Sequence, residues 1–443
     1  MILRLVRRVT AIRTFRHGDC YSNSVRPAIC AATFLLISLT GARAYSVLTH
    51  EAIIDSAWER IRPLLLARFP NTTPDELRRA HGFAYAGCII QDMGYYPRGS
   101  KFFSDLLHYV RTGDFIKNMI RESQDVDEYA FALGSLAHYA SDTQGHSIAV
   151  NRSVPIQYPK LRRKYGDVVT YEEDETAHIR VEFQFDVVQV AHGNYAPQAY
   201  RDFIGFEVAE GVLARAFHDT YGLQMTDLFS DLDRSLETYR HTVSSIIPKA
   251  TRVAWDIHHD ELKNAQPGVT RNRFVYNLSH ASYRKNWGKQ YDEPGIGTRL
   301  LALVIRIVPK VGPFSALAFR APTQQTEQLF EKSFDATLAT YRSFLQAVPA
   351  GTLQLPDRDF DTGEPTRPGE YRMADDTYSL LAINLAQKDP ASIDPAIRNN
   401  VLAFFSNLDQ PYATKRDQKQ WQKTVAAIGK LKSSQATASR VQQ

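Results

Sequence analysis

The chain has 443 residues, of which 44% are hydrophobic and 11% aromatic. This length and composition allow one large or two smaller folded domains and exclude a wholly disordered protein. The formal net charge is +5, but residues 1–44 hold seven arginines and one aspartate, which together contribute +6. The remaining chain is therefore close to neutral, so its basicity does not indicate nucleic-acid binding.

The first 44 residues have the layout of a secretory signal peptide. Arginines recur through residues 1–26, an apolar run covers 28–39, and the small residues Ala42 and Ala44 end the segment. A basic region, a short apolar region and an A-x-A end are typical of a signal that is cleaved during export. We therefore expect cleavage after Ala44 and a periplasmic or secreted protein. An uncleaved anchor is the alternative, although the apolar run is short for a membrane span.

Cleavage would also remove two of the three cysteines. Cys20 and Cys30 lie in the leader, so Cys88 alone would remain. We therefore expect no intramolecular disulfide in the mature protein. An exported protein of this kind has to be stabilised by its core and, by hypothesis, by bound metal.

The rest of the chain is predicted to be all-α. Apolar residues recur at helical spacing in five segments, 49–66, 125–139, 200–221, 227–247 and 324–348. Three more helices are predicted for 376–387, 391–406 and 415–432. The stretch 350–372 is rich in Pro, Gly and Asp and is predicted to be a connector. No sustained alternation of period two indicates a sheet, and 167–171 is at most a short strand or loop.

A change in composition near Asn264 divides the predicted helices into two regions. Residues 265–300 are rich in Gly, Pro, Asn, Arg and Tyr, which is typical of a loop. We therefore predict one domain at 45–264 and a mostly helical region of unknown role at 265–443. The strongly apolar segment 298–312 is interpreted as a buried helix or as an interfacial helix that rests on lipid.

Histidines and carboxylates recur at metal-ligand spacing in the first region. His138, Asp142 and His146 are four residues apart and share one face of a helix, and His178 and Glu182 form a second such pair. A single pair is a weak signal, because a lone histidine is more often a satisfied core or surface residue. The joint pattern is stronger, because eight candidates follow in order within 133 residues, namely His50, Asp92, His108, His138, Asp142, His146, His178 and Glu182.

Imidazole and carboxylate together form the ligand set of zinc hydrolysis sites. Several of the eight candidates are flanked by helical apolar residues, which places them on inward faces, where an unsatisfied polar group is costly. Two such faces inside a helical bundle would make a cage for more than one divalent metal. The sequence has no Ser-His-Asp arrangement, Walker loop or G-x-G-x-x-G fingerprint.

The order of these residues resembles the zinc-dependent phospholipase C/D superfamily. This group includes bacterial phospholipases C, the N-terminal domain of glycosylphosphatidylinositol phospholipase D, and the S1/P1-type nucleases. The resemblance covers roughly residues 45–250 and implies an all-helical bundle that holds three zinc ions in a cleft. It also implies that the mature N-terminal residue is a ligand through its amino group and carbonyl oxygen. Cleavage after Ala44 would expose Tyr45, five residues before His50.

The resemblance implies three groups of ligands. The first zinc would be held by Asp92, His108, His138 and Asp142. The second would be held by His146, His178 and Glu182. The third would be held by Tyr45, His50 and Asp142, with Asp142 as a bridge.

Two details qualify this transfer. Asp92 would act as a ligand or as the catalytic base that takes a proton from the attacking water, and Asp105 ranks below it as a ligand. His146 follows Asp142 by four residues rather than the six of bacterial phospholipases C and the nucleases. The spacing is closer to the glycosylphosphatidylinositol phospholipase D pattern, which weakens the transfer of substrate specificity.

We therefore expect an exported zinc-dependent phosphodiesterase of phospholipase C type, acting on phospholipid head groups with peripheral membrane contact through 298–312. The aromatic pairs 95–96 and 102–103 would line an apolar cleft, or they are ordinary core residues. A single-strand nuclease is the first alternative, and the basic run 160–164 would then contact nucleic acid rather than form a solvated loop. A non-catalytic, metal-stabilised lipid-binding module is the second.

Overall fold

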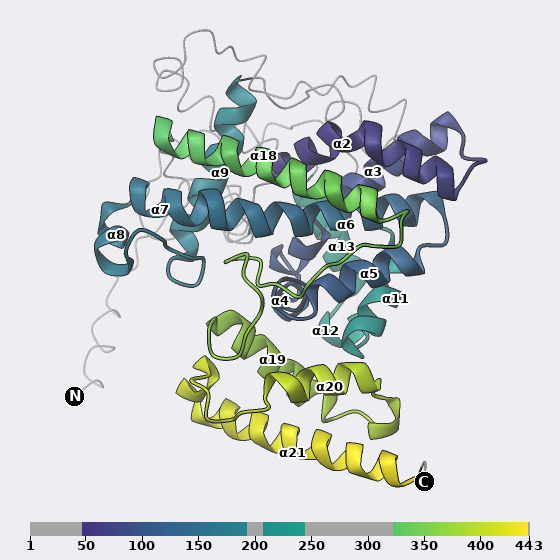
Figure 1. Cartoon of the computed structure of the whole chain (residues 1–443), viewed down its shortest axis with the longest axis vertical. Helices are drawn as coiled ribbons and strands as arrows, with labels where there is room; N and C mark the ends of the chain where they lie inside the picture. Colours follow the sequence, from purple (N-terminus) through teal and green to yellow (C-terminus); the bar gives the residue numbers. More distant parts are fainter. Residues whose placement is uncertain (1–46, 193–206, 244–321, 442–443) are drawn as a thin grey trace, which may run out of the picture.

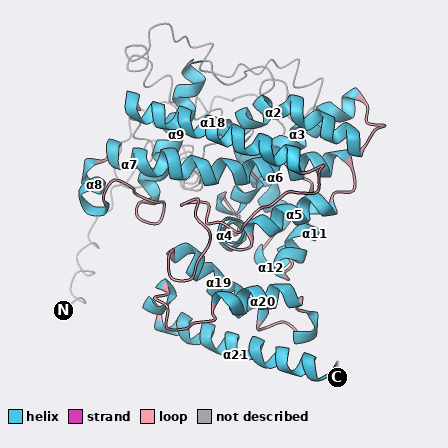
Figure 2. Cartoon of the chain, in the orientation of Figure 1, coloured by secondary structure: helices cyan, strands magenta, loops and turns pink. Residues whose placement is uncertain are grey.

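The computed structural model describes residues 47–192, 207–243 and 322–441, and these residues form an all-α fold (Figures 1 and 2). The prediction of the fold class is confirmed. Within the described ranges the only β-type pairing is an isolated bridge between Arg358 and Pro365. The predicted leader with Tyr45, the boundary after residue 264 and the apolar segment 298–312 lie outside the described residues.

Thirteen elements come from the N-terminal part of the described chain. They are α2 (Val47–Arg68), α3 (Pro74–Gly87), η2 (Ile90–Tyr95), α4 (Lys101–Tyr109), α5 (Thr112–Glu122), α6 (Val126–Gly145), η3 (His146–Val150), α7 (Asn151–Gln157), α8 (Pro159–Tyr165), α9 (Glu175–His192), α11 (Glu210–Tyr221), α12 (Met225–Leu228) and α13 (Leu232–His241). Six come from the C-terminal part, namely α18 (Gln324–Ala347), α19 (Arg372–Leu385), η6 (Pro390–Ser392), α20 (Pro395–Phe404), η7 (Ala413–Arg416) and α21 (Gln418–Val441).

The predicted helices appear in the structure with shifted ends. The helix predicted for 227–247 starts only at Leu232, because the Asp231 side chain accepts a hydrogen bond from the Arg234 backbone and caps α13 there. The interpretation of the basic run 160–164 as a loop is wrong, since the run lies in α8. Its charged side chains are exposed, as expected. Residues 167–171 form a loop rather than a strand.

Helix α6 is the centre of the N-terminal part and packs against α2, α3, α5 and α18 (Figure 1). Its contact with α3 depends on two glycines. A Cβ atom on Gly134 would lie 2.1 Å from the carbonyl oxygen of Ala84, and one on Gly87 would lie 2.0 Å from that of Phe131. Because both positions lack a side chain, the two backbones can approach closely. The middle of α6 is therefore buried, and its polar residues face the protein interior.

The C-terminal region is attached to this bundle at two places. Helix α18 crosses α6 and α2, and the Tyr341 hydroxyl donates to the Leu133 carbonyl at 2.8 Å. The predicted connector is confirmed as a loop between α18 and α19. Beyond it, α19 packs against α4 and against α20 and α21, which form the yellow end of the chain in Figure 1.

Two further observations concern the cysteine and the length of the helices. Cys88 is a free, buried thiol. Each helix of the described ranges is too short or too polar to cross a lipid bilayer.

Candidate metal centre

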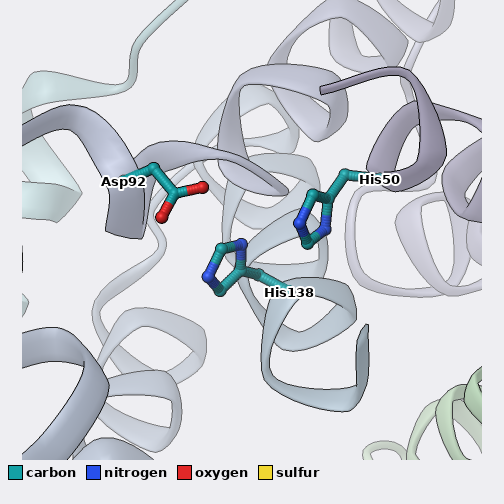
Figure 3. A group of neighbouring side chains, drawn as sticks. All are labelled: His50, Asp92 and His138. Carbon is teal, nitrogen blue, oxygen red and sulfur yellow. The ribbon is translucent and has the colours of Figure 1, made fainter. Parts of the chain in front are cut away.

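Three buried side chains from three elements converge beside α6. His50 comes from the first turns of α2, Asp92 from η2 and His138 from α6 (Figure 3). One donor atom from each lies within 4.8 Å of the others. The rings of His50 and His138 stack with centroids 4.6 Å apart, so both imidazoles present their edges to the same space.

Asp142 joins this group to a second one. His108 of α4, His138 and Asp142 also have donor atoms within 4.8 Å of one another. Asp142 Oδ1 lies 3.4 Å from His50 Nε2, whereas its Oδ2 lies 3.0 Å from His138 Nε2 and 3.5 Å from His108 Nε2. His108 Nε2 is also 3.3 Å from Asp92 Oδ1. The two oxygens of Asp142 therefore face different histidines, as a bridging carboxylate requires.

A third group lies at the C-terminal end of α6, where this helix continues into η3. His146, His178 and Glu182 bring donor atoms within 4.8 Å of one another, and the two imidazoles stack at 5.1 Å. His178 and Glu182 are one turn apart on α9, with Nδ1 and Oε1 3.0 Å apart. His146 begins the π-helical turn η3 directly after α6. The predicted stripe of α6 is thus divided between two groups, and wider turns of this kind often occur at functional sites.

Backbone carbonyls fix the orientation of two of these imidazoles. His108 Nδ1 lies 2.8 Å from the Ser104 carbonyl oxygen, and His138 Nδ1 lies 2.9 Å from that of Cys88. A carbonyl oxygen only accepts, so Nδ1 carries the proton in both rings. Nε2 is then the nitrogen that faces the carboxylates, which is the tautomer that a metal ligand needs.

Burial and neighbouring charges set the protonation of the cluster. Burial, helped by His138, lowers the pKa of His50 to about 3, and burial also lowers the pKa of His146. Burial alone would lower the pKa of His108 too, but its hydrogen bonds to Asp142 and Asp92 raise it to about 10. Without metal, His50 and His146 are therefore neutral at neutral pH, and His108 is protonated.

The pKa values of Asp92 and Asp142 are shifted in opposite directions. Burial raises the pKa of Asp92. Burial would also raise the pKa of Asp142, but His138 and His108 hold it far below its ordinary range. Asp142 thus stays ionised next to several imidazoles, whereas Asp92 has the higher proton affinity that a base requires.

The donor set fits a metal ion. Both ring nitrogens of His146 are fully buried and have no hydrogen-bond partner within the described chain. Such atoms are costly in a protein interior unless a cation satisfies them. Imidazole nitrogens and carboxylate oxygens match the preference of zinc.

The other candidates from the sequence have different roles. Asp105 forms an ion pair with Lys101 at 2.7 Å and accepts a hydrogen bond from Tyr95, so it stays outside the cluster. His81 is buried against Trp58 and lies 3.1 Å from Asp55, as expected for a structural histidine. The cleft interpretation of the aromatic pairs fails for Tyr96, which is buried, and likewise for Phe103, which stacks on Phe217 in the core.

Sequence reasoning missed residues that support the cluster. Buried Asp186 accepts hydrogen bonds from the backbones of Leu48 and Thr49 and so caps the start of α2, which carries His50. The sequence does indicate that Asp186 faces the cluster, since it follows Glu182 by one helical turn. Phe360 of the connector packs on the rings of His108 and His138, and no periodicity in the sequence indicates this contact.

Comparison with known families agrees with this geometry. Residues 49–231 match the family model described as zinc dependent phospholipase C. The matched range contains all eight side chains of the cluster. No curated protein and no solved structure matches the chain significantly.

Proposed function

We propose that the protein, whose residues 49–231 match the zinc-dependent phospholipase C family, is an exported phosphodiesterase of phospholipase C type. Its substrates would be phospholipids, cleaved at the head-group phosphoester. The observation that carries the proposal is the convergence of five histidines and three carboxylates in the buried interior of the matched range.

Bound zinc would supply Lewis acidity, which polarises a phosphoryl oxygen and makes water a nucleophile at neutral pH. We assign the ligand roles by group. His50, His108 and His138 would hold metal together with the shared carboxylate Asp142. His146, His178 and Glu182 would form a separate site. Three ions would need a further contribution from the amine of Tyr45.

Asp92 has two proposed roles. Its carboxylate lies 3.3 Å from His108 Nε2, close enough to serve as a ligand of the same site. The raised pKa of Asp92 also suits it to accept a proton from the attacking water. An Asp92→Asn variant that keeps its full metal content but loses turnover would favour the role of base.

The first experiment measures metal content and hydrolysis with the processed protein. Zinc should be found by elemental analysis, and phosphatidylcholine vesicles should release phosphocholine and diacylglycerol. Asp142→Asn should lose both metal and turnover, because it removes the charge shared by three histidines. His241→Ala is the matched control, since this histidine is exposed on α13.

Other substrates separate the alternatives. Cleavage of single-stranded DNA without phospholipid turnover would indicate a nuclease. Binding to vesicles without turnover would indicate a non-catalytic module. Absence of zinc from the processed protein would refute the proposal as a whole.

A second experiment concerns the mature N-terminus. Retaining residues 1–44, or adding one residue before Tyr45, should remove one zinc and most of the activity, because the α-amine would no longer be free at that position. N-terminal sequencing and zinc content of both forms test this prediction. Full turnover by the extended form would contradict it.

A further inference from the structure

The connector between α18 and α19 is folded against the metal centre, although it lies more than 100 residues beyond the family-matched range. Its central part turns back on itself, with the bridge between Arg358 and Pro365 and a hydrogen bond from the Asp359 backbone to the Glu364 carbonyl at 2.9 Å. Gly363 has φ +74°, and a Cβ atom there would lie 2.4 Å from the Thr143 carbonyl oxygen in α6. The turn thus rests directly on the helix that carries Asp142.

Phe360 lies within this turn. Its backbone N–H donates to the His108 carbonyl at 3.1 Å, and its ring centroid lies 5.3 Å from that of His108 and 5.9 Å from that of His138. The side chain is fully buried. The connector therefore forms one wall of the cluster.

The next residue, Asp361, is held at both its side chain and its backbone. Its Oδ2 accepts hydrogen bonds from the hydroxyls of Tyr109 at 2.8 Å and Tyr371 at 2.6 Å. Its carbonyl oxygen accepts a hydrogen bond from Asn151 Nδ2 at 2.7 Å. On the other side of Asn151, Oδ1 lies 2.7 Å from His178 Nε2. A continuous chain of hydrogen bonds therefore runs from the connector to a residue of the metal centre.

The direction of this chain follows from donor and acceptor chemistry. A backbone carbonyl only accepts, so the amide nitrogen of Asn151 must face Asp361. The amide oxygen then faces His178, and an oxygen acceptor requires that Nε2 of His178 carry the proton. In the neutral ring, Nδ1 then keeps the lone pair, 3.0 Å from Oε1 of Glu182. These two acceptors face each other as two ligands of one cation would.

We propose that Asp361 is a positioning residue of the metal centre, which acts through Asn151 to select the His178 tautomer that binds metal at Nδ1. The inference rests on one part of the proposed function, namely that His146, His178 and Glu182 form a metal site. It means that the region beyond the family-matched range completes this site.

The direct test is the tautomer of His178 in the unmutated full-length protein. Long-range ¹⁵N–¹H spectra of protein labelled at histidine should show His178 protonated at Nε2, with Nδ1 shifted on addition of zinc. Protonation at Nδ1 with zinc at Nε2 would overturn the proposal, and this measurement needs no variant that has to fold.

The second test uses zinc affinity by chelator competition. Asn151→Ala should weaken one zinc site by about 10–100-fold, the usual effect of losing a residue that orients a histidine ligand. Tyr371→Phe should shift the same site in the same direction but by less, because Tyr109 still anchors Asp361. An unchanged affinity in Asn151→Ala would overturn the proposal.

Tyr139→Phe is the matched control. The Tyr139 hydroxyl donates to the Pro356 carbonyl at 2.6 Å, so its loss loosens the same connector away from Asp361. Zinc affinity should stay unchanged in this variant, and a loss equal to that of Tyr371→Phe would show that only loop stability matters. These readouts are independent of lipid hydrolysis, so a protein with the expected tautomer but without turnover would refute the proposed function alone.

Discussion

Replacing Gly363 with alanine tests how tightly the connector is held on α6. The new Cβ would meet the Thr143 carbonyl oxygen at 2.4 Å and the Ser147 side chain at 3.3 Å. A backbone atom cannot move aside as a flexible side chain can, so the turn or the helix must shift. We expect a cost of about 1–2 kcal/mol for the left-handed backbone and about 1–3 kcal/mol for the steric overlap.

Gly351→Ala separates these two contributions. Gly351 has nearly the same backbone angle, φ +65°, but a Cβ there would meet nothing within 4 Å. This control should therefore show only the backbone cost. Urea unfolding followed by circular dichroism measures both variants, and Gly363→Ala should be the less stable by about 1–3 kcal/mol. Equal stabilities of the two variants would show that the connector does not rest on α6.

Three more predictions concern the metal centre. Because the pKa of His108 is raised to about 10 in the metal-free protein, a bound metal ion must displace its proton. The affinity for zinc should therefore rise about tenfold per pH unit between pH 6 and 8. Calorimetry in two buffers should show this proton release, and its absence would contradict the assignment. Asp186→Ala should cost about 1–3 kcal/mol in urea unfolding, because the backbone N–H groups of Leu48 and Thr49 lose their acceptor, and an unchanged midpoint would argue against capping. Asp105→Asn should keep its full zinc content in elemental analysis, since Asp105 pairs with Lys101, and zinc loss would place it in the centre.

The helical part of the site could be predicted because helix geometry is local. His138 and Asp142, like His178 and Glu182, are four residues apart, and that spacing alone places each pair on one face. The convergence of α2, η2, α4 and α9 around α6 is not local. It could be expected only through the family resemblance, since no spacing relates His50 to residues of distant helices.

One wrong interpretation and one omission have physical reasons. The charge of residues 160–164 favours a solvated loop, but Pro159 at the start of α8 and Gly166 directly after its end are residues typical of helix boundaries. The Pro, Gly and Asp content of the connector predicts its irregular backbone but not the surface on which it packs. An irregular segment carries no hydrophobic period, so the sequence does not reveal which surface its buried Phe360 covers.

The burial of Phe360 affects how the protein can be divided. A fragment that ends with α13 would retain all eight cluster side chains, but the aromatic covering of His108 and His138 would be missing. Water would then reach the ring of His108, whose pKa depends on burial and on its hydrogen bonds to Asp142 and Asp92. Expression trials for this protein should therefore keep the connector between α18 and α19, since a version that lacks it would present an open and altered cluster.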